Sequence, residues 1–420
     1  MKEINKPRLF VAGCIAILAT AMTFAIRTEL INVLGTQFKL SALEMGWVSG
    51  TAFWGFTLSM VFGGLLIDKL GMRNIILLAL LGHIAGVVLT IYSSGFTSLF
   101  VSTLLIGIAN GFVEAAINPL VATIYPEQKT AKLNLLHVWF PGGIVIGGLV
   151  VHFFHILEWN WQIQMGVILV PVLTYGILLL PMQFPKTARE SSGVSAKEMY
   201  RELSRPLFLL MVFAMLFTAA TELGTNQWIV SLLSNSTASP IILLVFISGI
   251  MVLGRLVAGK IEALFSTTGM LLFSAVFSAI GLFLLGVLEG PSLFVGAGVF
   301  SIGICFFWPT MLGFVAEYLP KTGAMGLSIM GGAGMLSVAL IIPFMGYLYD
   351  YSTLEVLPAG LDLMTLKQAL PDTPEKMQLL SIQAEAGQAT LRMIALVPLI
   401  LIAIFGWLYV YEKKKLKHVA

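Results

Sequence analysis

The chain has 420 residues, of which 58% are hydrophobic and 11% are charged, and its formal net charge is +3. Soluble globular domains carry about 25% charged residues, so this composition excludes a soluble enzyme or a nucleic-acid-binding domain. The apolar runs are long enough for helices to cross a bilayer, whereas the alternating ten-residue strands of an outer-membrane barrel are absent from the sequence. We therefore expect an all-α integral membrane protein.

Twelve apolar runs follow one another, and each is predicted to form one transmembrane helix. They cover residues 9–32, 45–67, 74–92, 97–124, 132–155, 163–183, 206–232, 240–261, 268–288, 291–317, 323–350 and 389–411. A polar connection over 184–205, rich in Lys, Arg, Ser and Glu, separates six runs from six. The predicted domains are a six-helix bundle over 1–183, a linker over 184–205 and a second bundle over 206–420, which includes an acidic, proline-interrupted outer loop at about 351–388.

Basic residues accumulate in alternate connections, beginning with Lys2, Lys6 and Arg8 ahead of the first run. Because positively charged connections stay in the cytoplasm, both termini are predicted to be cytoplasmic, and the Lys413–Lys417 run is interpreted as part of the same signal. The first run lacks a small-residue cleavage site, which favours a retained helix over a signal peptide. We expect a multi-pass monomer in a cell membrane, specifically a bacterial inner membrane.

Two charged residues, Arg27 and Glu29, lie in the outer third of the first span. Residues two positions apart point to different faces of a helix. Glu29 is a candidate for carrying a coupling proton. Arg27 is a candidate for binding an anionic substrate or for pairing with a buried acid. Snorkelling toward the membrane surface is the alternative for both side chains.

The connection after the second span, residues 64–73, has the sequence G-L-L-I-D-K-L-G-M-R. Its glycines permit a tight turn, and its Asp68 can meet helix-end amides or a basic partner. This ten-residue pattern resembles the signature loop of the major facilitator superfamily. The resemblance implies that Asp68, Lys69 and Arg73 belong to a gate. A degraded copy at the end of the eighth span adds Arg255 to the gate candidates.

The fourth span carries polar side chains where a lipid-facing helix should have none. Asn110, Glu114 and Asn118 fall at i, i+4 and i+8, so a helix places all three on one face. A carboxylate near the bilayer centre costs roughly 2.5–3.5 kcal/mol on insertion scales, and it is tolerated where it faces protein or water. Glu114 is the main candidate for carrying a proton, and a permanently bonded structural acid is the alternative.

The seventh span repeats this spacing with Thr218, Glu222 and Asn226. Glu222 is therefore a further candidate for carrying the proton. The amides of Asn226 and Gln227 are candidates for contacting substrate hydroxyls, and Trp228 offers a stacking face beside them.

Asn134 and His137 share a face near the start of the fifth span. Both are candidates for substrate binding, with a helix cap or a cytoplasmic gate as the alternative, and His137 adds a second titratable group. Trp139 and Trp308 lie within spans and are candidates for stacking on a sugar ring. Tryptophan is nevertheless common at membrane interfaces and in packed interiors.

Several motifs narrow the match within the superfamily. Residues 113–119 read V-E-A-A-I-N-P, residues 132–137 read K-L-N-L-L-H, and residues 307–310 read F-W-P-T. These motifs resemble those of the fucose–galactose–glucose:proton symporter family. The resemblance implies the major facilitator fold, with twelve transmembrane helices in two pseudo-symmetric six-helix bundles. It also implies that Glu114 is the protonatable acid and that Asn134 contacts the sugar.

We expect a secondary active transporter, not an enzyme, that imports a sugar together with protons by alternating access. The substrate would be a hexose, a deoxyhexose or an amino sugar held between the bundles. Asn110 and Asn118 would contribute to its site. We predict no cofactor other than the coupling proton, no metal and no catalytic residue, and the bilayer is the other partner. One alternative is the transport of an organic anion, an acidic sugar or a drug-like compound through Arg27 and His137. Another is a membrane receptor without transport.

Overall fold

The computed structural model describes residues 4–187, 194–236, 240–370 and 373–417, so positions 188–193 of the predicted linker lie outside the described residues. The described residues contain helices and no strand. Ten helical segments are long and apolar enough to cross a membrane. One of these, Glu44–Ile91, contains two spans joined at a sharp turn, and the shorter apolar helix Ile242–Leu256 provides one more. The predicted number of spans therefore agrees with the structure.

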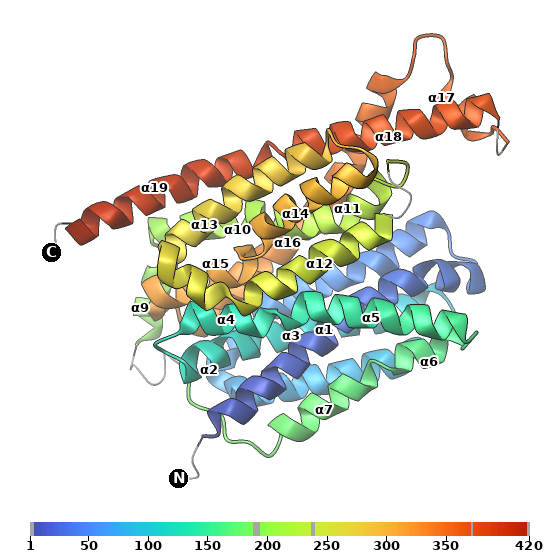
Figure 1. Ribbon diagram of the computed structural model, residues 1–420. Helices are drawn as coiled ribbons and strands as arrows, with labels where there is room; N and C mark the ends of the chain where they lie inside the picture. Colours follow the sequence, from blue (N-terminus) through green and yellow to red (C-terminus); the bar gives the residue numbers. More distant parts are fainter. Residues whose placement is uncertain (1–3, 188–193, 237–239, 371–372, 418–420) are drawn as a thin grey trace. The chain divides into compact units, whose positions relative to one another are not determined.

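The helices follow the chain in the predicted order (Figure 1). The first half contains α1 (Lys6–Gln37), α2 (Ala42–Ile91), α3 (Phe96–Ile124), α4 (Lys129–His137), α5 (Trp139–Ile156), α6 (Trp161–Gly166) and α7 (Leu169–Leu179). The linker contains α9 (Ala196–Leu203). The second half contains α10 (Pro206–Ala219), the π-helical turn η1 (Ala220–Gly224), α11 (Thr225–Leu232), α12 (Pro240–Leu256), α13 (Ala258–Leu285), α14 (Leu293–Ile304), α15 (Phe307–Tyr318), α16 (Gly323–Val356), α17 (Leu363–Lys367), α18 (Pro374–Ile394) and α19 (Val397–Lys417).

A glycine makes the turn between the second and third spans. Gly71 has φ 78° and ψ 154°, a conformation that residues with a side chain rarely adopt, and α2 changes direction there. This confirms the glycine-permitted turn predicted for residues 64–73. The corresponding change of direction after the eighth span falls at Ser266, with φ 63° and ψ 168°, six residues beyond the degraded copy of the motif.

Contacts divide the chain into two compact units. The first unit consists of Met1–Leu216, Arg255–Thr267 and Trp308–Leu336, and the second of Phe217–Gly254, Thr268–Phe307 and Ser337–Ala420. The first unit thus combines the N-terminal half with those parts of the later spans that the predicted topology places toward the cytoplasm. The domain boundaries predicted at 183 and 205 stay a prediction.

Within the first unit, α2 and α3 pack backbone against backbone. A Cβ atom on Gly107 of α3 would lie 2.5 Å from the carbonyl oxygen of Thr51, and one on Gly55 of α2 would lie 2.8 Å from that of Leu104. Small residues permit this approach between membrane helices, where van der Waals contact drives association. This close contact holds α3, the helix that carries Glu114, against α2.

Most of the predicted outer loop at 351–388 is helical. In the second unit, α16 runs to Val356, and α18 begins at Pro374 behind an N-cap in which the Thr373 hydroxyl accepts from the amide of Lys376. Figure 1 shows α18 continuing into α19, so the last helix begins well before the predicted position 389. The first turns of α18 are polar, and a hydropathy pattern detects only the apolar part of a helix. The predicted start therefore falls after the true start of the helix.

Candidate transport site

The polar stripe of the fourth span lies on α3, and Asn110, Glu114 and Asn118 are each about 1% exposed. They face protein, as an ionisable side chain in a lipid-length helix requires. The stripe does not form one site, however. Its two ends join different sets of side chains, both within the first unit.

Asn110 belongs to a network inside the N-terminal half. Its Nδ2 donates to the Thr23 hydroxyl at 2.8 Å, and its Oδ1 lies 2.8 Å from Nε2 of His83. The other ring nitrogen of His83 lies 3.0 Å from the hydroxyl of Tyr175. A neutral His83 protonated on Nε2 satisfies both contacts, with the Tyr175 hydroxyl donating to Nδ1. Both ends of the Asn110 amide are thus engaged by protein.

Glu114, Asn118 and His137 form a second cluster. Asn118 Nδ2 donates to the Glu114 carboxylate, and Asn118 Oδ1 lies 3.0 Å from Nε2 of His137. The same imidazole nitrogen is 3.7 Å from Glu114 Oε2. All three side chains are buried. A carboxylate, an amide and an imidazole arranged in this way can hold a proton at one position and pass the change in hydrogen bonding to the next.

Arg255 reaches this cluster through the backbone. Its Nη1 donates to the carbonyl oxygen of His137 at 2.8 Å, and the arginine is 2% exposed. The predicted gate residue therefore lies beside the acid-bearing cluster. The guanidinium of Arg255 and the carboxylate of Glu114 thus both lie against the same residue, His137.

A second set of contacts joins α4 to α15. The Thr130 amide and hydroxyl donate to Glu317 Oε1 at 3.0 and 2.7 Å, and Asn134 Nδ2 donates to the Thr310 hydroxyl at 3.2 Å. The sequence analysis missed Thr130, Thr310 and Glu317. The spacing of Thr130, Asn134 and His137 at i, i+4 and i+7 was the available signal. Asn134 Oδ1 is buried and has no hydrogen-bond partner among the described residues.

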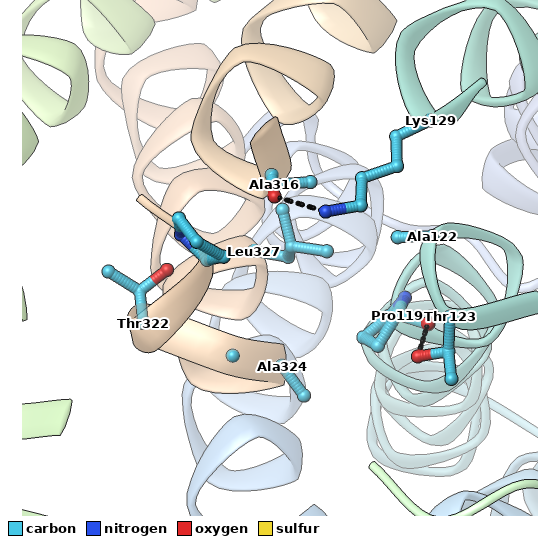
Figure 2. A pocket seen from close by; sticks show the side chains of 10 residues that line it. Pro119, Ala122, Thr123, Lys129, Ala316, Thr322, Ala324 and Leu327 are labelled. Carbon is cyan, nitrogen blue, oxygen red and sulfur yellow. Dashed lines mark hydrogen bonds between the residues drawn. The ribbon is translucent and has the colours of Figure 1, made fainter. Parts of the chain in front are cut away.

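A small cavity adjoins this contact and is lined mainly by apolar and small residues of α3, α15 and α16 (Figure 2). Its volume is about 380 Å³, including its open mouth. Lys129 enters it and donates to the carbonyl oxygen of Ala316 at 2.9 Å, near the C-terminal end of α15, where carbonyl groups lack helical partners. The lining offers few groups that could hold a polar substrate, and the cavity is better described as an entrance beside the α4–α15 contact.

The other gate candidates bond within the N-terminal half. Arg73 donates to the carbonyl oxygen of Leu180 through Nε at 3.3 Å and Nη2 at 2.9 Å, which caps the end of α7. Asp68 accepts from the Thr187 hydroxyl at 2.9 Å, and Lys69 is exposed. Their role in a gate stays a prediction.

Arg27 and Glu29 turn in different directions from α1. Arg27 is 6% exposed, lies 5.7 Å from the centre of the Phe24 ring, and donates to the Thr51 hydroxyl at 3.5 Å. No carboxylate pairs with it among the residues whose side chains the structure describes. Glu29 is exposed. Arg27 thus points into protein instead of snorkelling toward the surface.

The second unit holds the seventh-span candidates. The π-helical turn η1 contains Glu222, so the regular i, i+4 spacing predicted there is interrupted. Glu222 is buried, Asn226 Oδ1 has no hydrogen-bond partner among the described residues, and Gln227 is exposed. Trp228 donates to the Ile342 carbonyl at 3.1 Å. Its indole therefore packs on α16.

The two remaining tryptophans differ in exposure. Trp139 is 41% exposed, whereas Trp308 is buried at 5%. A Cβ atom on Gly334 would lie 2.5 Å from Cζ3 of Trp308. The glycine run of α16 thus makes room for Trp308, as close helix packing requires. Whether either ring contacts a substrate stays a prediction.

The Major Facilitator Superfamily model matches residues 9–262, more than half of the chain. The facilitated glucose transporter member 10 of solute carrier family 2 from Xenopus tropicalis is 27% identical over 185 residues, which cover 42% of this chain and 33% of that protein. A hexuronate transporter from Bacillus subtilis (strain 168) is 24% identical over 196 residues, which cover 45% of this chain and 46% of that protein. The chain thus spans between a third and a half of the length of these relatives.

Among solved structures, the E. coli fucose:proton symporter FucP superposes with a TM-score of 0.67 at 14% identity, covering 93% of this chain and 98% of that chain. This similarity confirms the predicted major facilitator fold. The relatives are transporters and not enzymes, also as predicted. The chain is a multi-pass membrane protein that belongs to the Major Facilitator Superfamily.

Proposed function

We propose that the chain is a proton-coupled sugar importer that works by alternating access. The observation that carries this proposal is the buried cluster of Glu114, Asn118 and His137. A titratable acid inside a lipid-length helix marks a substrate or proton pathway by default. The sugar is supported by the names of two similar proteins, a glucose transporter and a fucose:proton symporter.

Protonation of Glu114 would change what Asn118 can do. The ionised carboxylate only accepts hydrogen bonds, and it takes one from the Asn118 amide. A protonated Glu114 can donate a hydrogen bond itself, and it accepts the hydrogen bond from the Asn118 amide less strongly. Asn118 is then free to donate to a sugar hydroxyl. Proton uptake would thereby prepare one of the predicted substrate contacts.

The distribution of basic residues supports both termini in the cytoplasm. The proposed importer lies in the inner membrane of a bacterial cell and is active as a monomer. With this orientation, the residues that line the cavity of Figure 2 lie at the cytoplasmic ends of their helices. Sugar and protons would enter from the opposite side.

Uptake of labelled sugars into proteoliposomes tests the proposal. An inward proton gradient should concentrate at least one sugar, and Glu114→Gln should abolish the concentration while counter-exchange of that sugar continues. Glu29→Gln provides the matched comparison, since that acid is exposed. If Glu114→Gln still concentrates the sugar and Glu29→Gln or Glu222→Gln does not, the proton is carried elsewhere. If no sugar moves, the function is wrong.

One observation favours a second candidate function, the transport of an acidic sugar or another organic anion. Arg27 is buried without a carboxylate partner among the described side chains. A buried charge left uncompensated costs several kcal/mol, on the order of 3–5, and a carboxylate on the substrate would compensate it. The similarity to a hexuronate transporter also supports this candidate.

Competition between a hexose and the corresponding uronic acid decides between the two functions. An anion transporter would take up the uronic acid preferentially and would lose it on Arg27→Gln, with part of the uptake retained by Arg27→Lys. A sugar importer would prefer the hexose. In that case Arg27→Gln would alter stability without reversing the preference.

A further inference from the structure

A proline leaves one carbonyl beside the Glu114 cluster without a helical partner. In an α-helix the carbonyl of residue 137 accepts from the amide of residue 141, but residue 141 is proline and has no N–H. Next to it, Val138 donates to Asn134 and Gly142 donates to Val138, both at 3.1 Å. Val138, the one residue between α4 and α5, has helical angles, φ −54° and ψ −36°. The chain therefore keeps its helical direction past the carbonyl of His137.

Arg255 occupies this carbonyl. The distance from its Nη1 to the His137 oxygen is 2.8 Å, and the guanidinium is buried. Hydrogen bonds from a charged donor are stronger than those between neutral groups. The side chain of the same histidine lies against Glu114 and Asn118. His137 thus contacts the arginine through its backbone and the acid through its ring.

We propose that Arg255 is a positioning residue that couples the charge of Glu114 to the closure of α4, by holding the His137 carbonyl that Pro141 leaves vacant. The pairing of Pro141 and Arg255 is hereafter the carbonyl latch. The inference rests on the proposed function, since it takes Glu114 as the residue that gains and loses the proton.

The latch responds to the charge of Glu114. With Glu114 ionised, the guanidinium is held by the carbonyl and attracted by the carboxylate. When Glu114 takes a proton this attraction disappears, and the bond from Arg255 to the His137 carbonyl loses its electrostatic support. The charged or titratable groups on the packed helices α3, α4, α13 and α15 are Glu114, Lys129, Lys132, His137, Lys260, Glu262, Glu317 and Tyr318. A weaker hold of Arg255 on the His137 carbonyl then loosens the first turn of the fifth span.

A neighbouring contact provides a control that lacks this response. The Thr130 hydroxyl bonds Glu317, which in turn lies 3.3 Å from the hydroxyl of Thr267. These contacts hold the same end of α4 but do not involve the His137 carbonyl. Thr130→Val should therefore loosen the α4–α15 contact without removing its dependence on Glu114.

A cysteine in the cavity of Figure 2 reports the opening. Thr123 lines the cavity, and Thr123→Cys can be introduced after the two buried native cysteines, Cys14 and Cys305, are changed to alanine. The rate of labelling by N-ethylmaleimide is then measured on the full chain in proteoliposomes at several pH values. Every rate is divided by that of the parent reporter at the same pH, so that thiol chemistry cancels.

We expect Arg255→Gln to accelerate labelling several-fold and to abolish the further acceleration caused by Glu114→Gln. Pro141→Ala should act in the same direction but less strongly, because the new amide competes with Arg255 for the carbonyl. Arg255→Lys should retain part of the protection. Thr130→Val should accelerate labelling and leave the effect of Glu114→Gln intact.

The latch is overturned if Arg255→Gln and Pro141→Ala label at the parent rate, or if Glu114→Gln accelerates labelling equally with and without Arg255. If Arg255→Gln does not fold, Pro141→Ala and Arg255→Lys still decide the question. Failure of the proposed function is a separate outcome. It would show as sugar accumulation that survives Glu114→Gln, whatever the labelling rates.

Discussion

The two ends of the α3 stripe differ in what surrounds them. The Asn110 end joins Thr23, His83 and Tyr175 in a network whose hydrogen bonds lie within the N-terminal half. The Glu114 end contains an acid, an imidazole and, through a carbonyl, an arginine from the eighth span. The same residue spacing on one helix thus produces a structural network at one end and a titratable cluster at the other. Both ends are equally buried, so the two ends differ in the titratable and charged groups around them and not in exposure.

The largest expected effects come from replacing His83 or His137, which lie at opposite ends of the stripe, by alanine. His137→Ala is expected to abolish gradient-driven sugar accumulation, because Asn118 and Glu114 lose their titratable neighbour. His83→Ala is expected to lower the thermal unfolding midpoint, since Asn110 and Tyr175 each lose a partner at about 1–3 kcal/mol per buried polar group. Its accumulation ratio should match that of the parent. Uptake and melting measured on the same preparations check both outcomes, and reversed results would contradict the division of roles.

A smaller effect is expected from replacing Gly313, which lies at the contact between α4 and α15, with Gly142 as the control. A Cβ atom on Gly313 would lie 2.3 Å from the Thr130 hydroxyl and 2.8 Å from its Cα. Gly313→Ala should therefore push α4 and α15 apart, at a cost of about 1–3 kcal/mol. The Thr123→Cys reporter should then be labelled faster. Gly142→Ala is the matched control, because nothing lies within 4 Å of its added methyl. Equal labelling of the two variants would show that the contact does not hold the end closed.

The smallest effect concerns an acid at the surface. Glu198 and Ser195 form a capping box at the start of α9 in the linker. Bonds from the Ser195 amide and hydroxyl hold the pKa of Glu198 below its usual range. The pKa of Glu198 is lower in the folded helix than in the unfolded chain, so its ionised carboxylate stabilises the helix at pH values above the unfolded pKa. This stabilisation is lost as the pH falls through the folded pKa. The protection factors of the α9 amides, which are exchange rates corrected for their intrinsic pH dependence, should fall on acidification, and Ser195→Ala should weaken that dependence without changing transport. A loss of transport in this variant would give the linker a role that the comparison does not foresee.

The sequence predicted the helices well because their apolar runs have the length of a bilayer, and it predicted the turn at Gly71 because only glycine fits there comfortably. It also predicted the burial of Glu114. It could not predict that Asn110 and Asn118 belong to different networks, since that depends on His83 and His137, which reach α3 from other helices.

The other failures have physical causes of the same kind. The π-helical turn around Glu222 and the early start of α18 depend on backbone geometry and on capping, which hydropathy does not report. The carbonyl latch needs a proline in one span and an arginine far away in the chain. A proline at position 141 implies a vacant carbonyl in a helix, but no pattern in the sequence indicates which donor fills it.

The close contact of α2 and α3 restricts how a proton can reach Glu114. Where a Cβ atom on Gly107 or Gly111 would come within 2.5 Å of a backbone oxygen of α2, no water molecule has room. A chain of waters therefore cannot run between these two helices, and this side of the acid is insulated. If Glu114 carries the proton, as we propose, the proton reaches it from the end of the stripe where Asn118 and His137 lie. The glycines of this packing contact would then determine the side from which the proton arrives.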